Sequence, residues 1–442
     1  MIHLSHKDYK EKSKDDIIDD LEKALNENER LKRELRKYKN SNTPPSAHQH
    51  LKPTYSPKTV DVKPHKRGAP YGHTGTNKPQ KDTLNERHIT GKECPNCHTD
   101  DFRVIGCKLQ QQEEIPPDIK TETVNITRDI CQCNKCNLKF IARDNQTPLQ
   151  GRFGINLMVL VIFLKFIMRG VLRKTTCFLE ASFALKLAPA SVQAIIERAA
   201  QAGKKEYDSL QKKIRCAKVL YIDETSFSVL GINWWVWVFR SDTDMLLVIR
   251  NSRGNKVLEE ILGKNYKGIV VCDCWRAYDY LSNATLQRCW AHLLRKSKEL
   301  KNVPGRHFHK KISLLFDEII KFNAKERTDK QRKRKYLRMT KKLQKIVSYY
   351  SRYEECEAVT KYIDFHIDCW FTCIKIVGVQ PTNNYAEQAL RETVLVRKII
   401  GAFRSETGTK TYETLASLLA TWRIQKKDIK VELSRMLSKN LC

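Results

Sequence analysis

The sequence predicts a multidomain α/β protein built around a mixed, five-stranded sheet. Its 442 residues leave room for roughly three domains. Between residues 216 and 299, short runs of branched apolar residues alternate with turns and one helical pattern, as in an α/β domain. The segments on either side are helical, proline-rich or strongly basic. We therefore expect one core that contains the sheet, with helical parts before and after it.

Positive charge dominates the composition. Lys and Arg number 81 against 50 Asp and Glu, which gives a formal net charge of +31. Such an excess predicts a polyanionic partner, either nucleic acid or an anionic membrane. The best membrane candidate, residues 155–172, contains Lys165 and Arg169, so its apolar run is shorter than the roughly 20 residues that a span requires. We expect a buried helix there and no membrane partner.

The 15 cysteines bear on the compartment. The chain begins with Met1 and a charged stretch, without an apparent secretory signal. In that context, cysteines indicate a reducing interior, and metal sites or free thiols rather than disulfides. We expect a cytoplasmic protein.

The first two segments, residues 1–40 and 41–86, differ in kind. Residues 1–40 predict a helix after a capping-box-like start at Ser13 and Asp16, with apolar residues spaced alternately by four and three. This leucine-zipper-like seam predicts a short coiled coil, in which Asn28 favours a parallel dimer. A lone solvated helix is the alternative. Residues 41–86 are rich in Pro and Lys without an apolar period, which predicts a linker.

Two Cys-x-x-Cys pairs predict a zinc-binding module over residues 87–147. Four thiolates can close a tetrahedral site for a structural Zn²⁺, although the pairs are further apart than the usual 15–20 residues. Strand-like residues 102–105 and 123–126 are compatible with a zinc ribbon that carries a long loop. Buried thiols without zinc are the alternative. The predicted ligands are Cys94, Cys97, Cys133 and Cys136, with His98, Cys107 and Cys131 as substitutes.

Three further segments are predicted to be helical. Residues 148–215 form either a DNA-binding layer or plain core helices, and residues 425–442 form a C-terminal tail. Residues 300–376 form a basic insertion, because residues 325–345 hold eleven Lys or Arg against two acids. We favour a track for a DNA backbone there over a merely solvated face. Its candidate DNA contacts are Lys333, Arg334 and Lys335.

The α/β core, residues 216–299, favours one topology. Its first three predicted strands are joined by short turns and therefore form an antiparallel meander. A crossover helix, residues 254–262, makes the fourth strand parallel and adjacent to the first. Asp223 and Asp273 end the first and fourth strands, so this topology brings their carboxylates together. The predicted strands are Val219–Ile222, Trp234–Phe239, Met245–Ile249, Ile269–Cys272 and Leu286–Trp290.

Three acids suit a metal-dependent nuclease. Asp223 and Asp273 each follow a short apolar run, and Glu387 lies in a helical pattern between Asn383 and Arg391. Two strand-end carboxylates and one helical carboxylate can converge on a pair of hard cations, which suits in-line displacement at phosphodiesters. For either Asp alone a turn or cap role is more common, but the three contexts together favour catalysis.

At these positions the chain resembles the IS66 family of insertion-sequence transposases, over nearly its whole length. That family belongs to a larger group with an Asp-Asp-Glu triad on a ribonuclease-H-like core. One departure is local, because Cys274-Trp275-Arg276 stands where the family tends to have a Gly-containing turn. The matching blocks are Asp223-Glu224-Thr225 with Trp234–Val238, Asp273 with Tyr278, Cys289–Arg295, and, most specifically, Asn383–Glu387 with Arg391, Arg397-Lys398 and Phe403.

The resemblance implies a ribonuclease-H-like catalytic core formed by residues 216–299 and 377–424. It implies a transposase that binds element ends and catalyses DNA strand cleavage and transfer with Mg²⁺ or Mn²⁺. Asp223 would bridge both ions, and Asp273 and Glu387 would each complete one site. The implied partners are double-stranded DNA (terminal inverted repeats and target), further copies of the chain in a homodimer or higher multimer, and accessory proteins of the same element. The implied location is the nucleoid.

Basic and polar residues near the acids gain roles from this resemblance. Arg391 lies one helical turn from Glu387 and could meet a phosphate, or pair with Glu387 within the helix. His292 could orient a phosphate or a carboxylate, or be an ordinary core histidine. The DNA-binding candidates here are Arg391, Arg397 and Lys398, and the accessory candidates are His292 and Asn384.

Two other functional classes compete with this enzyme. A non-catalytic, zinc-stabilised DNA-binding protein derived from a transposase would not need all three acids, so their presence favours the enzyme. A basic RNA-binding factor would need a recognition module. The aromatic residues at 234–237 lie in a continuous apolar strand and are better explained as core than as a stacking platform.

Overall fold

The computed structural model describes residues 121–132 and 134–442, together with the isolated positions 21, 24, 25, 27, 28, 31, 98 and 100. Contacts divide the chain into two units, one formed by Met1–Pro44 and Thr121–Cys442 and one by Pro45–Lys120. The described positions between 21 and 31 are helical. The rest of the predicted coiled coil, and the linker 41–86, lie outside the described residues, so both stay predictions.

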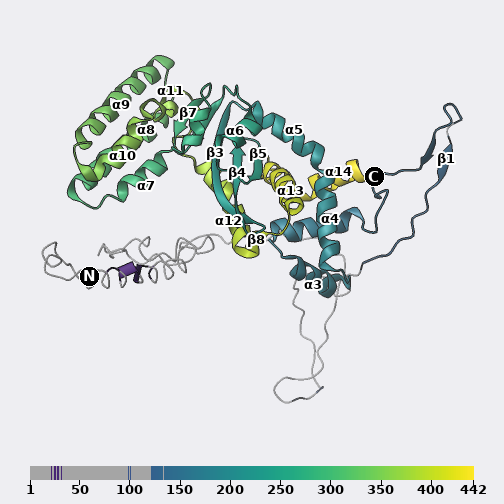
Figure 1. Cartoon of the computed structure of the whole chain (residues 1–442). Coiled ribbons are helices and arrows are strands. Elements are labelled where there is room, and N and C mark those ends of the chain that lie inside the picture. The colour runs from purple at the N-terminus through teal and green to yellow at the C-terminus, as the bar shows by residue number, and fades with distance from the viewer. Residues whose placement is uncertain are drawn as a thin grey trace. The chain divides into compact units, whose positions relative to one another are not determined.

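A mixed sheet of six strands forms the core of the described part of the chain (Figure 1). Its strands are β3 (Val219–Val229), β4 (Ile232–Arg240), β5 (Met245–Arg250), β6 (Ile269–Cys272), β7 (Thr285–Arg288) and β8 (Ala402–Phe403). The spatial order is β5-β4-β3-β6-β7, with β3, β4 and β5 antiparallel and with β6 and β7 parallel to β3. The predicted meander and parallel fourth strand are confirmed. The sixth strand, β8, pairs with the far end of β3 and was not predicted.

Two strands end two or more residues away from the predicted position. β3 does not stop at Asp223 but continues to Val229, because β4 pairs with it along that extension. β7 stops at Arg288 rather than Trp290, since Trp290 already begins α7 (Trp290–Lys298). Both predicted ends were wrong, although the four strands whose order was predicted lie in that order.

Helices that precede, cross over and follow the sheet form one apolar cluster with one of its faces. These helices are α2 (Ile155–Ile162), α4 (Pro189–Ala202), α5 (Lys204–Arg215), α6 (Asn255–Leu262), α13 (Glu406–Ile424) and α14 (Ile429–Leu441). Leu220 and Ile222 of β3 pack into this layer. A π-helical turn, η3 (Phe163–Ile167), and α3 (Leu172–Phe183) complete the expected helical stretch before the sheet. Among the described helices, none is long and apolar enough to cross a membrane.

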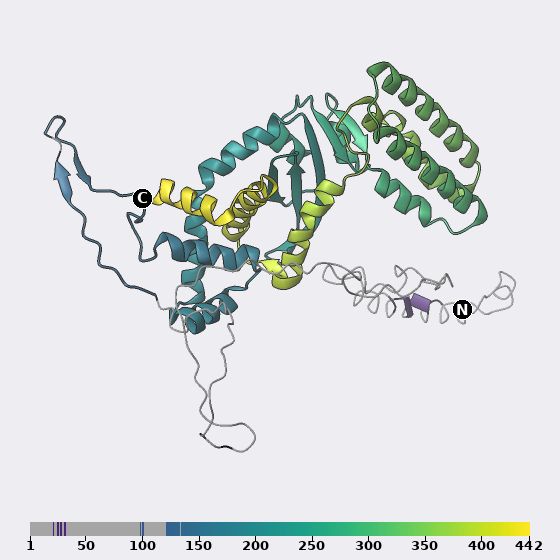
Figure 2. The same cartoon turned by 180° about the vertical axis from the view of Figure 1, so that it is seen from behind.

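The other face carries two separate apolar clusters. Tyr221 packs with α7 and the insertion, and Phe227 packs with α12. The two clusters also contain residues of α8 (Val303–Asn323), α9 (Asp329–Tyr350), α10 (Glu354–Asp364), α11 (Thr372–Lys375) and α12 (Asn384–Ile400). α12 contacts both β3 and β4 (Figure 2). Because side chains alternate along a strand, Asp223 points to this face, between the two clusters.

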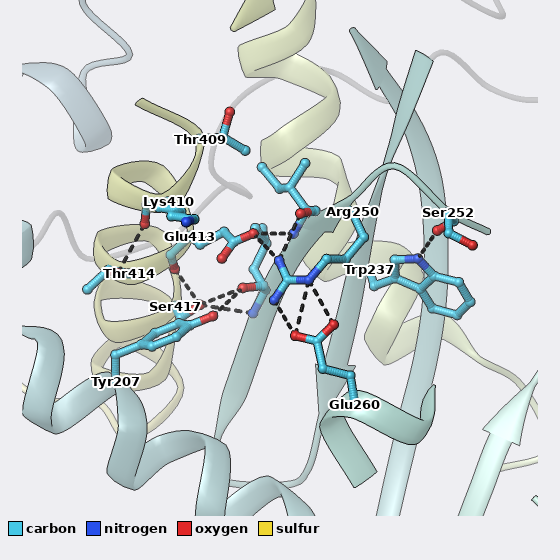
Figure 3. A network of polar contacts seen from close by, with 12 residues as sticks. Tyr207, Trp237, Arg250, Ser252, Glu260, Thr409, Lys410, Glu413, Thr414 and Ser417 are labelled. Atoms are coloured by element: carbon cyan, nitrogen blue, oxygen red, sulfur yellow. Dashed lines mark hydrogen bonds and ion pairs between the residues drawn. The ribbon is translucent and has the colours of Figure 1, made fainter. Parts of the chain in front are cut away.

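The edge strand β5 is covered by α13 through a stripe of polar side chains (Figure 3). Glu413, Ser417 and Thr421, each one helical turn apart, accept hydrogen bonds from backbone N–H groups of β5 at residues 249, 247 and 245. Arg250 pairs with Glu413 at 2.7 Å and with Glu260 of α6 at 2.6 Å. The helix therefore satisfies an edge that would otherwise expose unpaired donors.

A small antiparallel hairpin, β1 (Ile130–Gln132) and β2 (Lys139–Ile141), surrounds the second Cys-x-x-Cys pair. Residues 123–126, predicted as a strand, have no regular structure, so that prediction was wrong. Their side chains are exposed, and no described strand pairs with them. Cys136 is exposed. The zinc site stays a prediction, because residues 102–105 and the ligands Cys94, Cys97 and Cys133 lie outside the described residues.

Candidate active site

Asp223 and Asp273 lie where the parallel pairing of β3 with β6 ends. The last pair of that ladder is Tyr221↔Val271. β6 ends one residue before Asp273, and Asp223 stands two residues beyond the ladder on β3. The predicted topology thus brings both acids to the same end of the β3–β6 pair.

The start of α12 is fastened to β3 by Asn383, which is fully buried. Its Nδ2 donates a hydrogen bond to the carbonyl oxygen of Ile222, 2.7 Å away, and its backbone N–H donates to Cys289 Sγ at 3.1 Å. Glu387 follows one turn later on α12. Asn383 therefore positions the helix that carries this acid, while Asn384, the predicted accessory residue, is exposed.

Negative charge converges on Asp223. Burial, followed by the charges of Glu224, Asp273 and Glu387, raises the pKa of Asp223 to about 8. Backbone N–H groups hold one oxygen of each aspartate, that of Glu224 donating to Asp223 Oδ1 at 3.0 Å and that of Trp275 to Asp273 Oδ1 at 2.9 Å. Glu387 Oε1 is buried without a hydrogen-bond partner. A divalent cation would offset the repulsion between these acids, and Glu387 Oε1 could coordinate it. The residues therefore fit such an ion.

A tighter group of donors lies beside the triad. In residues 121–132 and 134–442, one set of three metal-ligating side chains has all its donor atoms within 4.8 Å of one another: Cys289, His292 and Glu387. His292 Nδ1 lies 3.7 Å from Glu387 Oε1. Burial lowers the pKa of His292, which favours the neutral imidazole. The triad of Asp223, Asp273 and Glu387 is wider, because its donor atoms do not all lie within 4.8 Å of one another.

Glu224 supports the site from the opposite face of β3. Its carboxylate accepts hydrogen bonds from Arg253 Nε at 2.8 Å and from the Tyr278 hydroxyl at 2.6 Å. The guanidinium of Arg253 lies over the rings of Trp235 and Trp275, at 4.7 and 4.1 Å from their centroids. Trp275 belongs to the loop that follows Asp273, so this stack connects that loop to β3 and β4.

Arg288 holds the same loop from inside the protein. It is fully buried and donates to the carbonyl oxygen of Asp273 and to Asp279 Oδ1. Neither Arg288 nor Arg253 was predicted as a site residue. The one available signal was a charged residue, Arg288, inside the predicted strand Leu286–Trp290.

A match to a family model covers all six strands of the sheet and the three acids. The model described as "Transposase IS66 family" matches residues 150–411, more than half of the chain. The chain belongs to the IS66 family of transposases. The resemblance recognised in the sequence is thereby confirmed, and the family marks the chain as a DNA-processing enzyme. A comparison with curated proteins finds no match.

On α12 of this transposase, the expected DNA-binding residues differ in exposure. Arg391 and Lys398 are exposed. Arg397 is half-buried, and its Nη1 donates to Thr225 Oγ1 at 3.3 Å and to the carbonyl oxygen of Ser226. Arg397 therefore fastens α12 to β3 in this conformation, while Arg391 and Lys398 present free positive charge.

The predicted DNA contacts in the basic insertion, residues 300–376, also differ in exposure. Lys333 and Arg334 on α9 are exposed. Lys335 instead pairs with Glu318 of α8 at 3.1 Å, and its side chain is only 10% exposed. Two of the three predicted contacts on α9 are thus accessible to a phosphate backbone.

In the metal-free transposase, Asp223→Asn should gain stability relative to the native chain as the pH rises. The folded-state pKa of about 8 exceeds the ordinary value of 3.8. The native carboxyl therefore contributes stability at low pH that is lost progressively up to about pH 8. The difference in unfolding free energy should grow by at most about 1.4 kcal/mol per pH unit. Urea unfolding between about pH 5 and pH 9 measures it, and a difference independent of pH would contradict the charge cluster.

Proposed function

We propose that this chain cuts DNA at the ends of its element and transfers the freed strands to target DNA, with Asp223, Asp273 and Glu387 as ligands of two Mg²⁺ or Mn²⁺ ions. The observation that carries the proposal is the placement of the three acids: Asp223 and Asp273 lie at one end of the β3–β6 ladder, and Asn383 fastens the helix of Glu387 to β3 at Ile222. The charges of Asp273 and Glu387 are among the causes that raise the pKa of Asp223, which agrees with this placement. Three neighbouring carboxylates repel one another, and cations bound among them offset that repulsion.

Each side chain has a separate task in this proposal. Asp223 would be the ligand shared by both ions, and Asp273 and Glu387 would each complete one site. Bound ions of this kind lower the pKa of the attacking water or 3′-hydroxyl and stabilise the leaving oxygen. At neutral pH the Asp223 carboxyl must release its proton when cations bind, since its pKa is about 8 without them.

DNA binding belongs to the exposed basic residues in this proposal. Lys333 and Arg334 on α9 hold the phosphate backbone, and Arg391 and Lys398 on α12 lie on the helix that carries Glu387. Element ends are recognised by the zinc module, by the helices of residues 148–215, or by both. A homodimer or higher multimer, formed through the heptad seam with Asn28, brings two ends together. Accessory proteins of the same element assist, and the chain works at the nucleoid.

The direct test is nicking of a plasmid that carries the DNA flanking the gene. With Mg²⁺ or Mn²⁺, the native chain should leave 3′-hydroxyl nicks at the repeat ends. Asp223→Asn, Asp273→Asn and Glu387→Gln should each lower the rate by about 10³-fold or more, or about 4 kcal/mol, because each removes a charged ligand. Glu392→Gln is the matched control, since Glu392 also lies on α12 but pairs with Arg169.

Binding to those ends without any metal-dependent nick, with and without the element's other proteins, would overturn the enzyme in favour of a non-catalytic DNA-binding derivative. Equal losses of nicking rate in Glu392→Gln and Glu387→Gln would show that the loss does not depend on the proposed metal ligand.

The salt dependence of DNA binding tests the basic helix. Each phosphate contact that is lost should reduce the slope of log affinity against log salt by about 0.9. The double variant Lys333→Ala, Arg334→Ala should therefore flatten the slope by about 2, measured by fluorescence anisotropy. Lys335→Ala should leave the slope unchanged, because Lys335 is already paired with Glu318. An equal change in both variants would contradict the assignment.

A further inference from the structure

Cys289, His292 and Glu387 differ in chemistry from the acid triad they adjoin. Cys289 is the N-cap residue of α7, and His292 lies on the first turn of that helix, three residues later. Residues three apart share a helix face, and this face meets the first turn of α12, where Glu387 lies. All three donor atoms are within 4.8 Å of one another.

Two of these donor atoms lack partners. His292 Nδ1 and Glu387 Oε1 are both buried without a hydrogen bond, and they lie 3.7 Å apart, too far for a hydrogen bond between them. Buried polar atoms are normally satisfied. A cation between the two atoms would satisfy both at once.

The donor set selects the kind of cation. Thiolate and imidazole are ligands for Zn²⁺ and other thiophilic ions, whereas Mg²⁺ prefers oxygen alone. Zinc bonds of about 2.0–2.3 Å place donors of a tetrahedral site roughly 3.3–3.8 Å apart. The His292–Glu387 separation already meets that spacing. Cys289 would give up its thiol proton on binding, and the backbone N–H of Asn383 already points at its sulfur.

We propose that Cys289, His292 and Glu387 form a binding site for one Zn²⁺ ion, and that this ion withdraws Glu387 from the Mg²⁺ pair. The site itself needs only the three donors. The withdrawal rests on the proposed catalytic role of Glu387. Zinc would then act as a competitive regulator of the transposase, with one carboxylate shared between a thiophilic site and a hard-metal site.

The absorption of bound Co²⁺ measures how many metal ions each chain binds, independently of enzymatic activity. Co²⁺ bound by thiolate absorbs in the near ultraviolet. The full-length native chain, stripped of metal and titrated with Co²⁺, should bind one equivalent more than Cys289→Ser or His292→Ala. Because the predicted N-terminal cysteine ligands are present in all three proteins, the difference isolates this site. Cys177→Ser removes an exposed thiol on α3 and is the matched control, with the native count. Equal counts in the native chain and both site variants would overturn the site.

Displacement of Mn²⁺ tests the withdrawal. Zn²⁺ should release bound Mn²⁺ from the native chain, and Cys289→Ser and His292→Ala should each require at least about tenfold more Zn²⁺. Cobalt binding without this difference would overturn the regulatory role while leaving the site. Absence of Mn²⁺ binding would contradict the regulatory role and the proposed function together, and the cobalt count would still decide the zinc site.

Discussion

The parallel ladder between β3 and β6 is the constraint on which the arrangement of acids depends. It covers only three residue pairs, from Val219↔Ile269 to Tyr221↔Val271. Beyond it, β3 continues with β4 and, only at its far end, with β8, and the chain leaves β6 at Asp273. The end of this short ladder therefore fixes both aspartates and leaves room on the sheet face for α12. Asn383 then fastens that helix to the carbonyl oxygen of Ile222, next to Asp223.

Bringing acids together raises the free energy of the folded chain, and the surroundings limit that cost. Burial and neighbouring charges hold Asp223 with a pKa of about 8, so it is largely neutral at pH 7 until cations bind. Glu224 is offset by Arg253, and Arg288 holds the carbonyl of Asp273 from the interior. The polar stripe of α13 along β5 fixes the far edge of the same sheet. The surroundings thus hold the acids in place before a cation binds, which is the preorganisation that a metal site requires.

Local pattern and connection length were sufficient to predict the order of four of the six strands. The apolar runs, the short turns between them and the crossover helix gave that order, and from it the placement of Asp223 and Asp273 at one end of neighbouring strands followed. The prediction failed where the structure of a segment depends on contacts with residues far away in the sequence. β3 extends past Asp223 because β4 pairs with it, and residues 123–126 are not a strand because no described strand pairs with them. Arg397 and Lys335 carry the same charge as their exposed neighbours, and only tertiary contacts with Thr225 and Glu318 distinguish them. Asn383 acts across 161 positions of sequence, which no local pattern reveals.

The central claim is that three carboxylates jointly hold a pair of hard cations, and electron paramagnetic resonance of bound Mn²⁺ tests it most directly. With a DNA fragment that contains an element end, the native chain should bind two Mn²⁺ ions, magnetically coupled as expected for ions roughly 3.5–4 Å apart. Asp223→Asn should abolish the coupling, because the bridging ligand is lost. An unchanged coupled pair in that variant, or no Mn²⁺ bound to the native chain, would contradict the account.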